Sequence, residues 1–476
     1  MSEPADAGAG SELVRRSATE LARLVATRQL APSELVAACL AQVERYNGAV
    51  NAVCTLSERA LDDARALDDR LARGEDPGPL CGLPAGIKDV TPTAGLRTTY
   101  GCPVYAQHVP AEDALVVQRL KAAGAVVLGK TNTPEFATGG NTFNPVFGRT
   151  RNPWHLGRSA GGSTGGGAAA LATGMIALAE GTDLGGSLRI PASFCGVVGL
   201  RPSPGVVPTW PSDFLWDTLQ VTGPMARTAE DVALMLDAVS GPSPRAPLAR
   251  PKGRYLETLR AGLRPGLKVA YCPDIAGIGV DPEIEALCRR AAFELRQLGV
   301  EVEEIHLDLA FARPAFLALR GHWMVAHQHH RLHLVDQFGD NLAGNIRAGL
   351  ATATETLGEA EQARGRVWEI FHNLLQHHHH LLTPCMVIPP FPVEENYPRT
   401  IAGKEMQTYI DWVASTFVLS LTGLPVASVP CGLDPHNLPA ALQLVGPPDG
   451  EGHVLALAHQ LQQACPIGLP PLPPRG

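Results

Sequence analysis

Residues 181–191 read Gly-Thr-Asp-Leu-Gly-Gly-Ser-Leu-Arg-Ile-Pro. Ser187 follows two glycines in this stretch, so successive backbone N–H groups can turn toward one point with no side chain between them. Converging donors of this kind stabilise the negative oxygen that forms when a nucleophile attacks a carbonyl. The apolar run at 175–179 precedes the stretch and is typical of a buried strand. We therefore expect a strand that leads into a loop with a reactive serine.

Helical and strand-like segments alternate on both sides of this loop. The spacing of apolar residues predicts helices over 114–123 and 165–173, and short apolar runs predict strands over 83–90, 125–128 and 175–179. Alternation of this kind is typical of an α/β fold with a mostly parallel sheet that is buried on both faces.

Composition divides the chain into a long central part and two short ends. We expect a flexible N-terminus over 1–10, a single domain over 11–465 and a flexible Pro-rich tail over 466–476. Within the domain, the Pro/Arg-rich residues 240–265 indicate an exposed connection, and residues 310–380 indicate a helical region rich in histidine.

The overall composition narrows the class of protein. Of 476 residues, 45% are apolar and 18% are charged, which is enough apolar material for a large core. The net charge of −8 disfavours nucleic acid and anionic membranes as partners. The ten cysteines are scattered, the N-terminus is acidic rather than basic, and no long apolar run is present. These features predict a cytoplasmic protein that binds neither nucleic acid nor a membrane.

Two short motifs match functions that their surroundings do not support. Residues 124–131 (GAVVLGKT) fit the phosphate-binding loop, but the residues between the glycines are apolar and are themselves strand-like. Residues 161–165 (GGSTG) fit the nucleophile elbow of α/β hydrolases, but the segment before them has no apolar run and is expected to be a loop. We therefore interpret neither motif as functional in that sense.

Two further stretches contain reactive side chains. Residues 82–89 read GLPAGIKD and residues 161–166 read GGSTGG. Lys88 ends an apolar run, and burial of its amine would lower its pKa by disfavouring the charged form. A neutral amine can accept a proton as a general base, whereas an exposed ammonium group cannot.

Together, the stretches at 82–89, 161–166 and 181–191 resemble the amidase signature family. That family has a lysine in a G-x-P-x-x-x-K-D context, a glycine–serine cluster and the pattern G-T-D-x-G-G-S-x-R-x-P. The likeness covers roughly residues 11–460 and continues through the segments 129–140, 150–154, 194–203 and 223–228. It implies an α/β fold with a large mixed, mostly parallel central sheet covered by helices on both faces. It also implies hydrolysis of amide bonds without a metal or other cofactor.

The resemblance implies a role for each of three polar side chains. Ser187 would be the nucleophile, Ser163 would be a bridging serine that follows a cis peptide bond from Gly162, and Lys88 would be the terminal base. The backbone amides expected to bind the oxyanion are those of Leu184, Gly185, Gly186 and Ser187.

Other residues near these stretches have supporting roles in this interpretation. Asp183 and Arg189 flank Ser187. We interpret them as a structural pair that fixes the loop at 184–187, which we call the glycine loop. The segment 209–216 contains three aromatic side chains, which form either a pocket wall or a packed loop. The candidate pocket residues are Gly139, Trp210, Phe214 and Trp216.

The histidine run His377–His380 is not interpreted as a metal site. Consecutive residues on a helix point about 100° apart, so four such side chains cannot converge on one ion. We expect this run to mark the end of a helix before the strand at 381–388, and we expect no metal.

The leading hypothesis is a serine hydrolase that cleaves small apolar or aryl amides, or carbamates (urethanes), through an acyl-enzyme. One alternative is a glutaminase-type subunit that passes ammonia to a partner in a transamidation complex. The other is a non-catalytic binding protein on the same scaffold, which would require a damaged set of catalytic residues.

Overall fold

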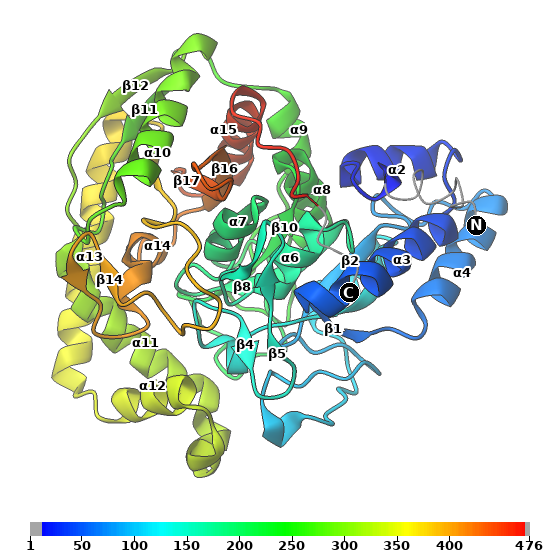
Figure 1. Ribbon diagram of the computed structural model, residues 1–476, viewed down its shortest axis with the longest axis horizontal. Helices are drawn as coiled ribbons and strands as arrows, with labels where there is room; N and C mark the ends of the chain where they lie inside the picture. The colour runs from blue at the N-terminus through cyan, green and yellow to red at the C-terminus, as the bar shows by residue number, and fades with distance from the viewer. Residues whose placement is uncertain (1–11, 472–476) are drawn as a thin grey trace.

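The computed structural model describes residues 12–471, which are built around an eleven-stranded sheet (Figure 1). From one edge to the other the strands are β1 (Val53–Leu56), β3 (Val126–Thr131), β2 (Pro84–Lys88), β8 (Leu178–Asp183), β10 (Val221–Ala226), β9 (Val198–Arg201), β16 (Val426–Leu433), β17 (Pro439–Val445), β13 (His380–Pro384), β11 (Lys268–Tyr271) and β12 (Glu301–Glu304). The expected flexible N-terminus lies outside the described residues, and the boundaries proposed for the single domain stay a prediction.

The sheet is mixed, which confirms the α/β class but not the expected majority of parallel pairs. Parallel pairing joins β3 to β2, β2 to β8, β13 to β11 and β11 to β12, whereas the other six pairs are antiparallel. The expectation of a mostly parallel sheet is therefore wrong. Strands joined by a short turn, such as β16 and β17, must run antiparallel. Apolar runs indicate where strands lie but not their direction.

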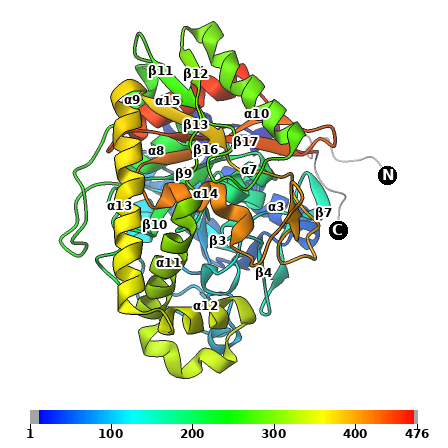
Figure 2. The ribbon, with the colours of Figure 1, turned by 90° about the vertical axis from the view of Figure 1, so that its left-hand side faces the viewer.

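Helices cover both faces of the sheet. Figure 2 shows α11, α13 and α14 on the side facing the viewer, with α12 below them. On this side the helices are α11 (Arg313–Gln328), α12 (Asp340–Leu350), α13 (Thr354–His377) and α14 (Ala414–Ser420). The strands β16 and β17 also contact two helices, α10 (Pro282–Glu294) and α15 (Glu451–Ala464).

Period-2 alternation along β17 explains how one strand contributes to two apolar clusters. Leu442 and Leu444 pack in the cluster that includes α10 and α15, whereas Ala441 and Val445 pack in the cluster that includes α11, α13 and α14. Successive side chains of a strand point to opposite faces, so a continuous apolar run is buried on both sides.

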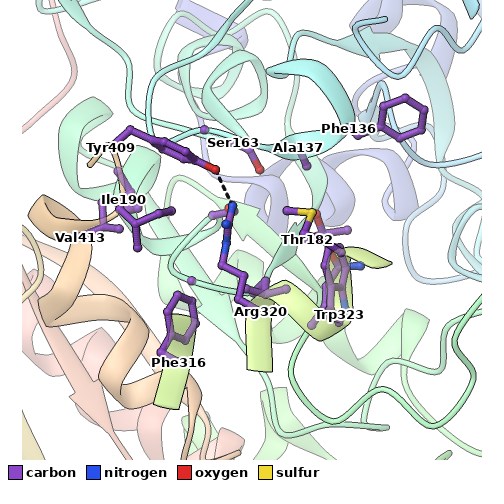
Figure 3. Close-up of a pocket in the computed structure, with 18 residues that line it drawn as sticks. Phe136, Ala137, Ser163, Thr182, Ile190, Phe316, Arg320, Trp323, Tyr409 and Val413 are labelled. Atoms are coloured by element: carbon purple, nitrogen blue, oxygen red, sulfur yellow. Dashed lines mark hydrogen bonds between the residues drawn. The ribbon is translucent and has the colours of Figure 1, made fainter. Parts of the chain in front are cut away.

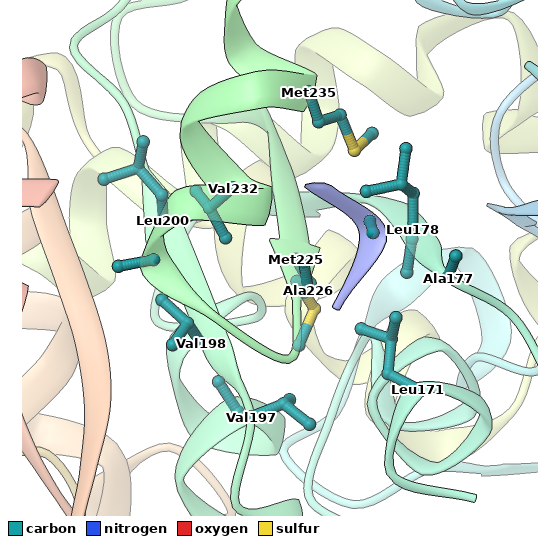
Figure 4. Close-up of a cluster of buried hydrophobic side chains, with 14 of the residues drawn as sticks. Leu171, Ala177, Leu178, Val197, Val198, Leu200, Met225, Ala226, Val232 and Met235 are labelled. Atoms are coloured by element: carbon teal, nitrogen blue, oxygen red, sulfur yellow. The ribbon is translucent and has the colours of Figure 1, made fainter. Parts of the chain in front are cut away.

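Other helices pack around the middle of the sheet and its β1 edge. They are α2 (Ala18–Ala26), α3 (Pro32–Val50), α4 (Ala60–Ala72), α5 (Leu115–Ala122), α6 (Gly165–Ala172), α7 (Arg189–Cys195), α8 (Ala229–Val239) and α9 (Tyr255–Arg260). Figure 4 shows Leu178, Met225 and Val232 within one buried cluster, where side chains of β8, β10 and α8 meet. This core supports β8, the strand that leads into the glycine loop.

The shorter elements lie outside the central sheet. Three two-stranded ribbons are formed by β4 (Phe143–Asn144) with β5 (Gly148–Arg149), β6 (Arg151–Asn152) with β7 (His155–Ser159), and β14 (Thr400–Ile401) with β15 (Lys404–Glu405). Short 3-10 helices occur at Pro103–Tyr105, Glu135–Ala137, Leu295–Leu298, Ala310–Ala312, His329–Gln337 and Asp411–Val413.

The expected exposed connection at 240–265 is only partly irregular. It contains α9, whose Tyr255 and Leu259 are buried and which packs against α8 and α15. The many Pro and Arg residues around this short helix obscured its apolar spacing.

The histidine run ends a helix, as expected. Helix α13 ends at His377 and strand β13 begins at His380, whose pKa burial lowers to about 3. His378 contacts Glu303, and His379 accepts a hydrogen bond from the Lys268 backbone amide. Within residues 12–471, no three His, Cys, Asp or Glu side chains are grouped as a metal site requires.

The two misleading motifs have different outcomes. In the motif at 124–131, residues 126–131 form strand β3, so the structure agrees with the strand interpretation of that motif. The expectation of a loop before GGSTG is wrong, because β7 precedes it and α6 follows it. The alternating burial of β7 comes from polar and glycine residues in a two-stranded ribbon, which an apolar-run criterion does not detect. Among residues 12–471, every helix is too short or too polar to span a membrane.

Candidate active site

Two neighbouring strands bring Lys88 to the glycine loop. Strand β2 ends at Lys88 and runs parallel to β8, which ends at Asp183. Because parallel strands have their carboxyl ends at the same edge of a sheet, Lys88 and the loop after β8 meet there. The Lys88 Nζ lies 2.7 Å from the Ser163 Oγ and donates to the Thr182 Oγ1 at 3.0 Å.

Ser163 and Ser187 line the same cavity. The Gly162–Ser163 peptide bond is cis, which confirms that expectation. The segments of the two serines are joined by a hydrogen bond of 3.2 Å from the Thr164 backbone amide to the Ser187 carbonyl oxygen. Ser163 is fully buried, whereas Ser187 is half-buried at the wall of the cavity. Lys88, Ser163 and Ser187 are thus brought together.

Burial lowers the pKa of Lys88 to about 7, as its position in an apolar run predicts. The carboxylates of Glu180 and Asp183 act in the opposite direction and offset part of the effect. A lysine with this pKa is largely neutral at mildly alkaline pH, so its amine can accept a proton from a neighbouring hydroxyl.

Three residues of the glycine loop, Leu184, Gly185 and Ser187, line the cavity. Within the described residues, the amides of Gly185 and Ser187 donate to no protein acceptor, but the Gly186 amide donates to the Asp183 Oδ1 at 2.9 Å. Gly186 has a φ of +121°, and a Cβ there would clash with the Thr416 hydroxyl. Gly186 therefore supports the shape of the loop with its amide, which is not free to bind an oxyanion.

Asp183 and Arg189 form a fully buried ion pair. The Arg189 Nε and Nη2 donate to the two Asp183 carboxylate oxygens, each at 3.0 Å, and Arg201 lies 3.4 Å from one of them. Burial alone would raise the pKa of Asp183, but the two guanidinium groups outweigh it and hold that pKa below its usual range. Arg189 also donates to the Gln443 Oε1 at 2.7 Å.

Replacing Arg189 by methionine is expected to lower the free energy of unfolding by about 3–5 kcal/mol, because the change leaves a buried carboxylate with one partner fewer. Urea denaturation followed by circular dichroism measures this. The matched control is Arg254→Met, which breaks a surface pair with Glu257 in which Arg254 is 80% exposed. That change is expected to cost less than about 1 kcal/mol. Equal losses in the two variants would contradict the structural role.

A second buried lysine lies on the neighbouring strand. Lys130, on β3, donates to the Thr91 carbonyl oxygen and to the Thr93 Oγ1. Burial lowers the pKa of Lys130 to about 8 and raises the pKa of Glu180 and of Asp89 above their usual values. Sequence reasoning missed this group, although charged residues inside apolar runs are a signal of it. A lowered pKa alone does not identify a base, because Lys130 has no serine partner among the described residues.

Apolar side chains form much of the wall of the cavity beside Ser187. Gly139 lines this cavity, as expected, but no residue of the aromatic segment 209–216 lines it. Trp210 lines a neighbouring cavity, Phe214 packs edge-on against His322, and Trp216 is 67% exposed. Apart from Leu184, the apolar side chains that line the cavity were not found from sequence; they are Phe136, Ala137, Ile190, Phe316, Trp323, Met324, Ile410 and Val413.

Comparison with known proteins identifies the family of this chain. The amidase family model matches residues 34–455. An acylamidase from Rhodococcus erythropolis is 35% identical over 460 residues, which cover 94% of this chain and 95% of that protein. A glutamyl-tRNA(Gln) amidotransferase subunit from Moorella thermoacetica is 35% identical over 487 residues, covering 95% and 97%.

Solved structures agree with these relatives. A bacterial aryl acylamidase of the amidase signature family superposes with a TM-score of 0.90 at 28% identity, covering 96% of this chain and 97% of that one. A 6-aminohexanoate cyclic dimer hydrolase complexed with substrate gives 0.84 at 26% identity, covering 96% and 99%. The resemblance inferred from the motifs is confirmed. This chain belongs to the amidase signature family and is an amidase, a hydrolase of C–N bonds.

Proposed function

We propose that Lys88, Ser163 and Ser187 form a proton relay that cleaves an amide through an acyl-enzyme. The observation that carries this proposal is the buried Lys88 Nζ at 2.7 Å from the Ser163 Oγ, beside a cavity that Ser187 also lines. Neutral Lys88 takes the proton of Ser163, which takes the proton of Ser187 as the Ser187 oxygen attacks the substrate carbonyl carbon.

The tetrahedral oxyanion is bound by backbone amides of the glycine loop. Gly185 and Ser187 supply free amides, and Leu184 lies at the same wall of the cavity. When the C–N bond breaks, the proton returns through Ser163 to the departing nitrogen. Water then attacks the acyl-enzyme, passes a proton to the relay and releases the acid and free Ser187.

The cavity and the relatives support a substrate class. An apolar, partly aromatic wall binds small apolar or aryl acyl groups through burial of their surface. The acylamidase and aryl acylamidase relatives support an aryl amide, and a carbamate presents the same carbonyl and nitrogen to the relay.

The chain is expected to act without a partner. Purified protein alone should release 4-nitroaniline from butyryl 4-nitroanilide, which absorbance measures directly. The competing proposal is a glutaminase-type subunit of a transamidation complex, which the Moorella thermoacetica relative supports at equal identity. That alternative would be favoured if the protein turned over no anilide and released ammonia from glutamine only when the other subunits of such a complex were added. A purely binding role is disfavoured because all three relay side chains are present.

A further inference from the structure

One charged side chain reaches into the cavity that Ser187 lines. Arg320 lies on α11, is 5% exposed, and is the only lining residue of that cavity, within the described chain, with a permanently charged side chain. Figure 3 shows its guanidinium group extending from α11 toward the Tyr409 hydroxyl and the side of the cavity that holds Ser163. One turn earlier, Phe316 stacks on Phe417 with ring centroids 4.2 Å apart, which positions this face of α11.

The charge of Arg320 has no carboxylate partner among residues 12–471. Its neighbours are neutral: Nη2 donates to the Tyr409 hydroxyl at 2.6 Å, and Nη1 donates to the Asn345 Oδ1. By contrast, Arg313 on the same helix pairs with Asp411. Buried guanidinium groups are normally paired, because removing a charge from water without a counter-ion is costly.

Tyr409 adds a second donor to the same place. Its hydroxyl oxygen accepts from Arg320 and, at 2.6 Å, from the Asn345 Nδ2. Because two groups already donate to this oxygen, the Tyr409 O–H is left to donate, and no acceptor for it is found among the described residues. Burial raises the pKa of Tyr409, so its hydroxyl keeps its proton. Asn345 orients both groups.

We propose that Arg320 and Tyr409 bind a carboxylate carried by the amide substrate. This inference rests on the proposed hydrolytic function and refines its substrate class from a neutral aryl amide to an aryl amide with one negative charge. The carboxylate supplies the counter-ion of Arg320 and the acceptor of the Tyr409 hydroxyl, and charge-assisted hydrogen bonds of this kind are stronger than neutral ones. The apolar wall binds the rest of the substrate.

The first experiment compares matched substrates. One pair places the charge on the acyl part, as the 4-nitroanilides of succinate and butyrate. The other pair places it on the amine part, as 4-acetamidobenzoate and 4-methylacetanilide. We expect kcat/KM to be about tenfold or more higher for the charged member of one pair. The pair that shows the preference identifies the part of the substrate that reaches Arg320. Equal or lower values for both charged members would overturn the proposal.

Variants test whether Arg320 causes the preference. Arg320→Met is expected to abolish the preference, with kcat/KM falling more for the charged substrate than for its neutral partner, and Arg320→Lys is expected to keep part of the preference. The matched control is Arg347→Met on α12, a surface arginine paired with Asp336, which should leave the preference unchanged. An equal loss on charged and neutral substrates in Arg320→Met would show a structural role only.

A binding measurement separates this proposal from the relay. Calorimetric titration of Ser187→Ala with the preferred charged substrate and its neutral partner requires no turnover. We expect the charged compound to have a Kd at least about tenfold lower, and the difference to disappear in Ser187→Ala with Arg320→Met. Equal Kd values would refute the carboxylate site even if the amide is hydrolysed by the wild type. A clear difference would support the site even if the relay proposal fails.

Discussion

Ser187→Ala is expected to lower kcat by at least about four orders of magnitude, because members of a catalytic relay act as a unit and loss of the nucleophile removes the acyl-enzyme route. The variant keeps its fold, since the hydroxyl that is removed sits at a half-buried cavity wall and not in the core. Release of 4-nitroaniline measures the loss. A fluorophosphonate probe followed by mass spectrometry should label Ser187 in the wild type and leave the variant unlabelled.

A second serine on the adjoining helix provides the matched control. Ser193, on α7, is buried and does not line the cavity. Ser193→Ala should therefore keep turnover within about threefold of wild type and should be labelled by the probe at Ser187, because a change outside the relay does not alter the reacting atoms. Full turnover by Ser187→Ala, or labelling at another serine, would refute the assignment of the nucleophile.

Site features that depend only on neighbouring residues in the chain could be predicted from the sequence. Lys88 at the end of an apolar run and Ser187 after two glycines were identifiable because burial of an amine and convergence of amides follow from neighbouring residues. The structure brings Lys88, Ser163 and Ser187 to one site. The resemblance to the family had implied this grouping.

The pocket wall could not be predicted in the same way. It is built by α11 and by the segment around Tyr409, which lie more than a hundred residues after Ser187 in the chain. Their apolar spacing indicates only helices, and it does not show which face meets the glycine loop. The segment at 209–216 is conspicuous for its aromatic residues, yet composition does not show whether Trp216 faces a cavity or the solvent.

Hydrogen bonding distinguishes the amides of the glycine loop from one another. All amides between Leu184 and Ser187 were equivalent at the level of sequence, but the Asp183 carboxylate accepts from Gly186. Asp183, which the sequence analysis paired with Arg189, therefore also determines which amides remain free to bind an oxyanion. Fixed donors with no other acceptor are those that contribute most to stabilising developing charge.

Lys88→Met is expected to lower kcat/KM by about three orders of magnitude or more, because the variant has no group to accept the proton of Ser163. In the wild type, only the neutral amine is active. The pKa of Lys88 is about 7, so kcat/KM should rise about tenfold per pH unit below 7 and level off above it. The residual activity of Lys88→Met should lack this limb of the pH profile.

The neighbouring buried lysine shows whether the pH dependence belongs to Lys88. Lys130 is equally buried and has a pKa of about 8, but its amine donates to Thr91 and Thr93 and contacts no serine among the described residues. Lys130→Met should therefore lose stability while its kcat/KM still rises with pH as in the wild type. A pH limb that disappears in Lys130→Met and persists in Lys88→Met would show that Lys130, not Lys88, is the base. An acidic optimum in the wild type would exclude both, since protonating either amine removes its ability to accept a proton.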